Sequence, residues 1–186
     1  AELEPDQKFF FIIDEINRGN LSKIFGELMM LIESDKRGKY SVPLTYSEKD
    51  DALFSVPENL YLIGTMNTAD RSLAIVDYAL RRRFRFITLK PKFNDRFKEF
   101  LSAKGFSKDF IQEISSKLNS LNVKIESDKN LGTGFLIGHS FFCNANSEDE
   151  REWFENIVKF EIKPLLEEYW FDDNEKVNDA IKELLL

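Results

Sequence analysis

The sequence predicts an α/β domain followed by a helical domain. Three observations favour this class: short continuous apolar runs end in polar residues, amphipathic segments lie between these runs, and helical spacing dominates from about residue 94 onward. Continuous apolar runs of about five residues are typical of sheet strands covered on both faces, and apolar residues three and four positions apart are typical of helices. We place the boundary at Pro91 to Asn94, which gives domains 1–93 and 94–186.

The first domain alternates between strand-like and helix-like segments. The predicted elements, in chain order, are a strand over 9–13, a helix over 20–35, a hairpin over 40–57, a strand over 59–67, a helix over 71–84 and a strand over 85–91.

Each of these elements follows from its local pattern. The runs FFFII and LYLIG are apolar throughout, so we expect two strands buried on both faces. The segment 20–35 keeps helical spacing in spite of Gly26. Two short β-type runs around a charged loop indicate the hairpin. The helix over 71–84 ends in arginines, and Pro91 ends the third strand.

The second domain is predicted to consist of helices. Ser107 is a suitable N-cap for a helix whose apolar stripe has a spacing of three and four residues. The members of that stripe are Phe110, Ile111, Ile114, Leu118, Leu121 and Ile125. A glycine-rich segment interrupts the pattern, and helical spacing resumes over 150–169, where Pro164 requires a break or a new first turn. A last amphipathic helix is expected over 177–186.

Composition and charge restrict the class of protein. With 42% hydrophobic residues, 18 of them Phe, the chain can form a packed core. A net charge of -7 disfavours a duplex DNA site on this chain alone, because phosphate binding requires clustered Lys and Arg. The single cysteine, Cys143, allows no internal disulfide, which fits a reducing cytoplasm. No apolar run approaches the ~20 residues of a membrane span.

Polar residues follow both predicted buried strands. Asp14 and Glu15 come directly after the first, and Asn67, with Thr68 and Asp70, follows the second. In an open parallel sheet such residues meet at the carboxyl edge, where ligands bind. Asp14 could hold Mg²⁺ directly or through water, Glu15 could deprotonate an attacking water, and Asn67 could position that water or a phosphate. The alternative is that the acids cap the next helix and that Asn67 is a turn residue.

Four stretches carry a family resemblance: 9–33 (FFFIIDEINRGNLSKIFGELMMLIE), 42–47 (VPLTYS), 56–84 (VPENLYLIGTMNTADRSLAIVDYALRRRF) and 135–142 (FLIGHSFF). Nearly the whole chain resembles the motor domain of McrB-type GTPases, AAA+ proteins of modification-dependent restriction systems. MNTADRS with ALRRRF is the most specific part. The resemblance implies part of a three-layer α/β/α AAA+ core, with the hairpin as the insert before sensor 1, followed by a helical lid.

The resemblance also implies roles for individual residues. Asp14 and Glu15 correspond to the Walker B pair and Asn67 to sensor 1. The segment NTAD, which ends at Asp70, resembles the guanine-reading motif of GTPases.

Two further positions take roles from the same resemblance. Arg82 and Arg83 match the arginine-finger region, although cations at a helix end also interact favourably with the helix dipole. His139 lies in the IGHS segment, where it could sense nucleotide; a lone histidine is otherwise a packing residue, and without a Cys or His partner nearby zinc is disfavoured.

Cofactors and partners follow from the resemblance as well. It implies GTP with Mg²⁺, assembly into a ring, expected to be a hexamer, and a McrC-like nuclease subunit as partner. The 5-methylcytosine-dependent reading of DNA is expected to belong to a separate domain, and the compartment to be the cytoplasm.

One departure from the family pattern concerns the phosphate-binding loop. The motif G-x-x-x-x-G-K-[ST] is absent from the sequence, so we expect the loop and its strand to precede Ala1 and the isolated chain to be inactive. Two alternatives remain open. One is an ATP-hydrolysing AAA+ protein of the MoxR-like type, and the other is a non-catalytic assembly module.

Overall fold

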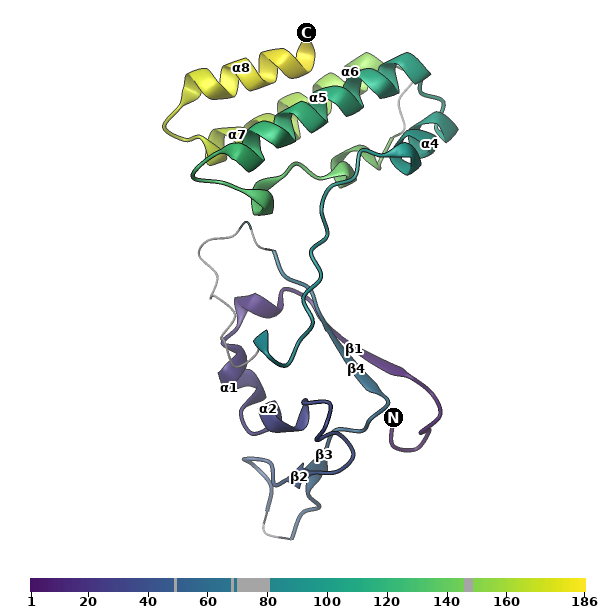
Figure 1. Ribbon diagram of the computed structural model, residues 1–186, viewed down its shortest axis with the longest axis vertical. Coiled ribbons are helices and arrows are strands. Elements are labelled where there is room, and N and C mark those ends of the chain that lie inside the picture. The colour runs from purple at the N-terminus through teal and green to yellow at the C-terminus, as the bar shows by residue number, and fades with distance from the viewer. Residues whose placement is uncertain (49, 68, 70–80, 146–148) are drawn as a thin grey trace. The chain divides into compact units, whose positions relative to one another are not determined.

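The computed structural model describes residues 1–48, 50–67, 69, 81–145 and 149–186. The chain forms two compact units, 1–88 and 89–186. The first contains short strands and helices, and the second is helical, in agreement with the predicted fold class (Figure 1).

A parallel pair of strands forms the framework of the first unit. Strand β1 (Phe9–Ile13) lies beside β4 (Leu60–Gly64), with Phe9 opposite Leu60 and Ile13 opposite Gly64 (Figure 1). Both predicted strands are confirmed. Because the strands run in the same direction, their carboxyl ends lie at the same edge.

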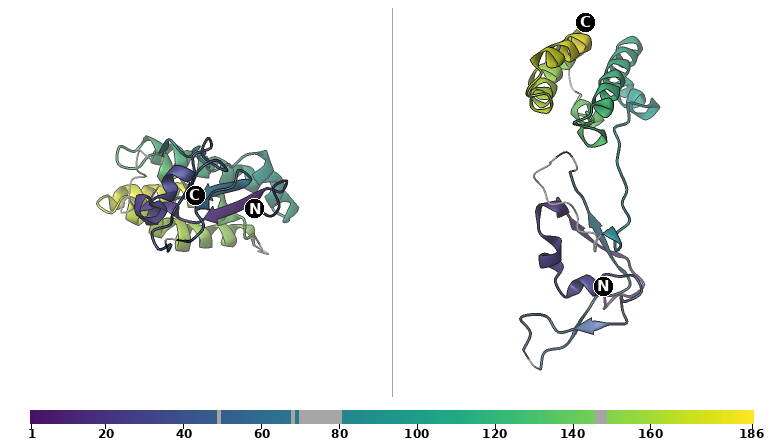
Figure 2. Two further views of the ribbon diagram at one scale, coloured as in Figure 1. Left: turned by 90° about the horizontal axis from the view of Figure 1, so that it is seen from below. Right: turned by 60° about the vertical axis from the view of Figure 1, so that its left-hand side comes forward.

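Short helices cover one face of this strand pair, as Figure 2 also shows. A 3₁₀ turn, η1 (Ile16–Arg18), precedes α1 (Leu21–Phe25) and α2 (Leu28–Leu31). The predicted continuous helix over 20–35 is wrong, because Gly26 adopts a positive φ of 44° and separates α1 from α2. The small core between helices and strands contains Ile16, Leu21, Phe25 and Ile32, with Ile13 and Leu62 packed against it.

The opposite face of the strand pair is exposed. Phe10 and Ile12 are 59% and 65% exposed, and the Phe10 ring stacks on Tyr61 at a centroid distance of 5.4 Å. The prediction that these strands are buried on both faces is therefore wrong for this chain. The apolar run matches a covered strand, but no described segment packs on this face.

A short hairpin confirms the prediction for 40–57. Strand β2 (Ser41–Val42) pairs antiparallel with β3 (Phe54–Ser55). The Glu27 carboxylate anchors the loop, because its Oε1 accepts hydrogen bonds from Thr45 N at 2.8 Å and Thr45 Oγ1 at 2.7 Å. The bond from the Thr45 side chain is the main reason why the pKa of Glu27 lies below its usual value.

The two remaining predictions for the first domain have different outcomes. The predicted third strand over 85–91 is wrong: this segment is irregular, and Ile87 and Leu89 are 77% and 91% exposed. A strand requires a hydrogen-bonded neighbour, and among the described residues none lies beside this segment. The predicted helix over 71–84 falls mainly on residues 70–80, which are outside the described residues.

The second unit packs its helices around one core (Figures 1 and 2). Its elements are α4 (Asp95–Ala103), α5 (Lys108–Ser127), η2 (Thr133–Phe135), η3 (His139–Phe142), α6 (Glu150–Ile157), η4 (Val158–Ile162), α7 (Lys163–Tyr169) and α8 (Asn174–Leu185). Helix α5 begins after Ser107 as predicted, and all six residues of its predicted apolar stripe are buried.

Pro164 has the effect predicted from the sequence. It lies in the first turn of α7, and the turn before it, η4, is a π-helix in which Lys163 N donates to Val158 O, five residues earlier. Proline has no N–H to donate to the carbonyl four residues earlier, that of Phe160, and its ring crowds that carbonyl. The helix therefore contains one wider, π-helical turn before it continues as α7.

A single carboxylate connects the end of α5 to α7 and α8. Asp128 pairs with Lys176, accepts a hydrogen bond from Trp170 Nε1 at 3.0 Å and caps the turn at Asn130 N at 2.8 Å. The Lys176 ammonium contributes most to lowering the pKa of Asp128 to about 2. The Asp128 side chain is only 9% exposed, so this ion pair is part of the packed structure of the unit.

Candidate functional site

Two predicted site segments meet at the carboxyl edge of the β1–β4 pair. Because Ile13 lies opposite Gly64, Asp14 and Thr65 are the first residues beyond paired strand ends. The backbone pairing continues past the strands, since Thr65 N donates to Ile13 O at 3.0 Å and Ile16 N donates to Thr65 O at 2.9 Å. The structure therefore brings the segment of Asp14 and Glu15 beside the segment that leads to Asn67, as the sequence predicts.

The hydroxyl of Thr65 connects both acids. Thr65 Oγ1 donates a hydrogen bond to Asp14 Oδ1 and accepts one from Glu15 N at 3.1 Å. Thr65 was not among the candidates predicted from the sequence. The only clue in the sequence was its position directly after the second apolar run. Which acids it contacts becomes clear only from the register of β1 and β4.

Glu15 has an unusual backbone conformation. It is the only non-glycine residue with positive φ in the described part of the chain (φ 50°, ψ 46°), and this left-handed conformation costs on the order of 1–2 kcal/mol. Its carboxylate is 46% exposed and pairs with Arg18 Nε at 2.5 Å. Such strain persists only where neighbouring contacts impose it, and it is concentrated at functional sites.

A close approach of side chain to backbone supports this turn. A Cβ on Gly64 would lie 2.8 Å from Ile16 Cδ1 and 3.3 Å from Ile16 Cβ. The absence of a side chain at Gly64 therefore allows Ile16 to pack directly on the end of β4, which places Asp14 and Glu15 at the edge.

Asn67 is exposed and takes part in a local turn. Its Oδ1 accepts a hydrogen bond from Ala69 N at 3.0 Å, which is the turn role considered as an alternative. Its backbone carbonyl accepts from Asn17 Nδ2 at 3.1 Å. Asn17 is 7% exposed, and its Oδ1 is buried without a hydrogen-bond partner among the described residues. The amide of Asn17 is a second connection between the two segments that the sequence analysis missed.

The two candidate arginines differ in their surroundings. Arg83 is largely buried, with its side chain 12% exposed, and pairs with Glu33 at 2.5 Å. Arg82 is exposed, and no ion pair or hydrogen bond joins it to another residue in the described part of the chain. Arg83 is therefore part of the packing of its own unit, whereas the charge of Arg82 faces solvent.

The remaining candidates lie outside the described residues or in the second unit. Asp70 and Thr68 lie outside the described residues. His139 belongs to the second unit, where its Nδ1 accepts a hydrogen bond from Lys92 N at 3.2 Å and its ring contacts Phe93 edge to face. These contacts match the packing role considered for a lone histidine.

The strand end offers oxygen ligands for a metal ion. Asp14, Glu15 and Thr65 supply only oxygen atoms, and Thr65 engages Asp14 Oδ1. This set fits Mg²⁺, which binds through one or two carboxylates and keeps several waters. Among the described residues, no group of three His, Cys, Asp or Glu side chains forms a complete protein cage for a metal.

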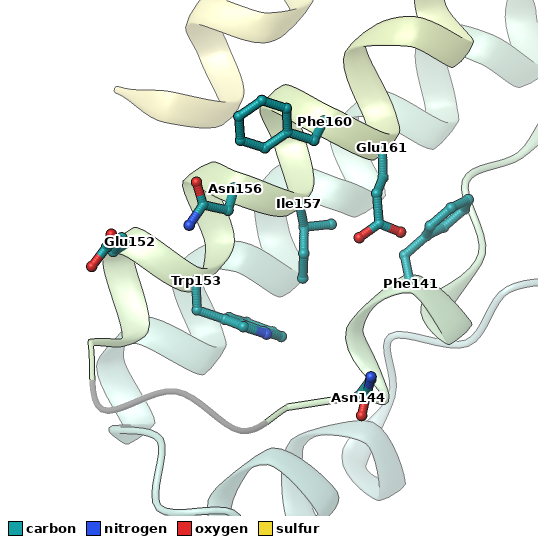
Figure 3. Close-up of a pocket in the computed structure, with 8 residues that line it drawn as sticks. All are labelled: Phe141, Asn144, Glu152, Trp153, Asn156, Ile157, Phe160 and Glu161. Carbon is teal, nitrogen blue, oxygen red and sulfur yellow. The ribbon is translucent and has the colours of Figure 1, made fainter.

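A separate pocket lies in the second unit. It has a volume of about 360 Å³, and none of the predicted site residues lines it (Figure 3). Trp153, Ile157 and Glu161, from α6 and η4, face Phe141 and Asn144 across it (Figure 3).

In the described residues, no helix is long and apolar enough to cross a membrane.

Comparison with known proteins identifies relatives for both halves of the chain. Residues 4–84 match the family described as "AAA domain (dynein-related subfamily)", and residues 113–178 match "McrB, alpha-helical lid domain". The chain is 53% identical, over its whole length, to the "Type IV methyl-directed restriction enzyme EcoKMcrB subunit" of Escherichia coli K12 and spans 42% of that protein.

A second relative is more distant. Over 91% of its length, the chain is 29% identical to the "Type II restriction enzyme BsuMI component YdiS" of Bacillus subtilis 168 and spans 51% of that protein. The chain thus spans about half the length of these curated relatives.

Proposed function

The chain carries the AAA domain and the α-helical lid of an McrB-type AAA+ protein. We propose that it is part of a GTP-hydrolysing motor subunit of a modification-dependent restriction system. One observation supports this most. The acids that correspond to Walker B and the segment that corresponds to sensor 1 leave adjacent parallel strands and are joined through Thr65.

The chemistry divides among three side chains of this edge. Asp14 would hold Mg²⁺, which would neutralise negative charge on the nucleotide phosphates. Glu15, exposed, on a constrained backbone and paired with Arg18, would orient an attacking water and accept its proton once this pair opens. Asn67 would position that water or the terminal phosphate through its Nδ2, because its Oδ1 is engaged by Ala69 N.

Base reading is proposed for the segment that ends at Asp70, by resemblance alone. His139 is a weaker candidate for nucleotide sensing. Its Nδ1 already accepts from Lys92 N, so only Nε2 is left for such a contact.

Of the two arginines, Arg82 is the better candidate for a finger that reaches a neighbouring subunit. Its side chain is exposed, whereas Arg83 is engaged by Glu33. A finger supplied in trans raises hydrolysis without contributing to nucleotide binding in a monomer. Mixing a Glu15→Gln protein with an Arg82→Ala protein should therefore restore part of the activity in mixed rings. The same experiment with the Arg83→Ala protein in place of the Arg82→Ala protein serves as the comparison.

The phosphate-binding loop would come from chain outside this sequence. The 186 residues contain no G-x-x-x-x-G-K-[ST], and the chain spans only about half of its relatives. The exposed apolar face of β1 and β4 is a surface that further elements of the same core could cover. The isolated chain would then be inactive in hydrolysis, and a non-catalytic role in assembly is the alternative for it.

The proposed partners are other copies of the subunit in a ring, a McrC-like nuclease, and DNA through a separate domain, in the cytoplasm. The alternative within the motor class is an ATP-hydrolysing protein of the MoxR-like type. Nucleotide competition on the full-length protein that contains this chain distinguishes the two. The proposal expects labelled GTP to bind and an equal concentration of unlabelled ATP not to displace it. Binding of labelled ATP that an equal concentration of GTP does not displace would favour the alternative.

A further inference from the structure

We propose that Thr65 is a positioning residue that orients the metal-binding carboxylate of Asp14 and holds the backbone of the water-activating Glu15, an inference that rests on the proposed hydrolytic function. Thr65 touches neither nucleotide nor water in this scheme. It acts through Asp14 and Glu15, which the structure joins to it by hydrogen bonds.

Thr65 makes four hydrogen bonds to one short segment. Its backbone N–H donates to Ile13 O, and its backbone carbonyl accepts from Ile16 N at 2.9 Å. Its hydroxyl donates to Asp14 Oδ1 and accepts from Glu15 N at 3.1 Å. Each of the four residues from 13 to 16 is thus bonded to Thr65, and the two bonds of the hydroxyl involve the two acids.

The hydroxyl bonds have a directional consequence for Asp14. A hydroxyl has one hydrogen, and Thr65 uses it on Asp14 Oδ1. This bond restrains the Asp14 carboxylate through Oδ1 and leaves Oδ2 for a cation or a water of its shell. Partners that orient a ligating carboxylate commonly change metal affinity or activity by about 10–100-fold when they are removed.

The consequence for Glu15 concerns its backbone. Glu15 N and Ile16 N, on either side of the left-handed residue, both donate to Thr65. A left-handed conformation at a non-glycine residue requires such external contacts. Thr65 therefore determines the direction in which the Glu15 side chain leaves the chain, and loss of its hydroxyl removes one of the two contacts.

The test compares variants at one position in the full-length protein. Thr65→Val and Thr65→Ala remove the hydroxyl and keep the backbone bonds, and Thr65→Ser keeps the hydroxyl. Thr45→Val is the matched control, because it also removes a hydroxyl that donates to a carboxylate, that of Glu27, outside the proposed site.

Two measurements separate positioning from a structural role. The first is turnover as a function of Mg²⁺ concentration, and the second is nucleotide affinity by titration with and without Mg²⁺. Thr65→Val should need about tenfold more Mg²⁺ and turn over about 10–100-fold more slowly, with metal-free nucleotide affinity unchanged. Amide exchange at Glu15 and Ile16 should be faster in Thr65→Val than in the wild type.

The outcomes are distinct. Recovery in Thr65→Ser to within a few-fold of the wild type supports the inference. A Thr65→Val protein with the Mg²⁺ dependence of the wild type overturns it, as does a Thr65→Ser protein as impaired as Thr65→Val. If Thr65→Val fails to fold, Thr65→Ala gives the same comparison. A wild-type protein that hydrolyses no nucleotide refutes the proposed function itself, and the inference about Thr65 with it.

Discussion

Replacing Asp128 with asparagine should weaken the second unit where α5 meets α7 and α8. The substitution keeps the shape of the side chain but only one oxygen, so it can keep the hydrogen bond from Asn130 N to Oδ1 or the one from Trp170 Nε1 to Oδ2, and not both. It removes the charge that pairs with Lys176, and that pair is the main cause of the low pKa of Asp128.

The magnitude follows from this pKa. It falls from its usual value of 3.8 to about 2 in the folded protein, and a difference of this size corresponds to about 2 kcal/mol of folding free energy. The folded pKa lies below the unfolded one, so this stability is complete above about pH 4 and is lost as the pH falls towards 2. Because asparagine keeps part of the hydrogen bonding, we expect Asp128→Asn to lose about 1–2 kcal/mol at pH 7.

The assay is urea denaturation followed by tryptophan fluorescence. The chain has two tryptophans, and both Trp153 and Trp170 lie in the second unit, so the signal reports the unfolding of that unit. The difference in unfolding free energy between wild type and Asp128→Asn should shrink towards zero between pH 4 and pH 2. Asp172→Asn is the control, because Asp172 is an exposed carboxylate.

Two results would refute this reasoning. One is a loss in Asp128→Asn no larger than that in Asp172→Asn. The other is a difference from the wild type that stays constant down to pH 2, because the ion pair with Lys176 would then contribute nothing that depends on the charge of Asp128.

Three further predictions concern the first unit and the whole chain. Gly64→Ala should destabilise the turn at Ile16 by roughly 1–3 kcal/mol, seen as faster amide exchange over 9–16; unchanged exchange would show that Ile16 moves aside at little cost. Arg83→Ala should lower the stability of the first unit by about 1–3 kcal/mol, because it leaves Glu33 without its partner. Arg82→Ala should leave this stability within about 0.5 kcal/mol of the wild type in the same exchange experiment, and equal effects of the two substitutions would contradict the structural role assigned to Arg83. The purified 186-residue chain should hydrolyse neither GTP nor ATP above background, and steady turnover would refute the need for an external phosphate loop.

The local sequence pattern was sufficient to predict an element where its formation depends mainly on its own residues. The stripe of α5 predicted which side chains are buried, because a helix makes its backbone hydrogen bonds within itself and only its apolar face has to find neighbours. Pro164 likewise has a local effect on the preceding turn. Gly26 was misjudged, because helical spacing of the apolar residues continues across a glycine whose backbone turns away from the helix.

Elements that depend on other segments were predicted less well. The apolar run of β1 indicates a covered strand, yet Phe10 and Ile12 are exposed, because cover must come from elsewhere in the sheet. The segment 85–91 has strand composition but lacks a hydrogen-bonded neighbour among the described residues.

The candidate site shows the same division. Asp14, Glu15 and Asn67 were found from their places after two apolar runs, and the structure confirms that these strands are parallel neighbours. Thr65 and Asn17 were missed, because a threonine or an asparagine near a strand end carries no signal until the strand register is known. The distinction between Arg82 and Arg83 depends on Glu33, about fifty residues away in sequence, so local pattern could not supply it.

The role of Glu15 is the central claim, and Glu15→Gln in the full-length protein tests it most directly. The substitution keeps the size of the side chain but cannot accept the proton of the attacking water. Nucleotide affinity and ring assembly should remain at wild-type levels, while turnover falls by about 10²–10⁴-fold, the usual effect of losing a general base. Turnover at the wild-type rate, or loss of nucleotide binding in place of turnover, would contradict the assignment of the hydrolytic site to this strand end.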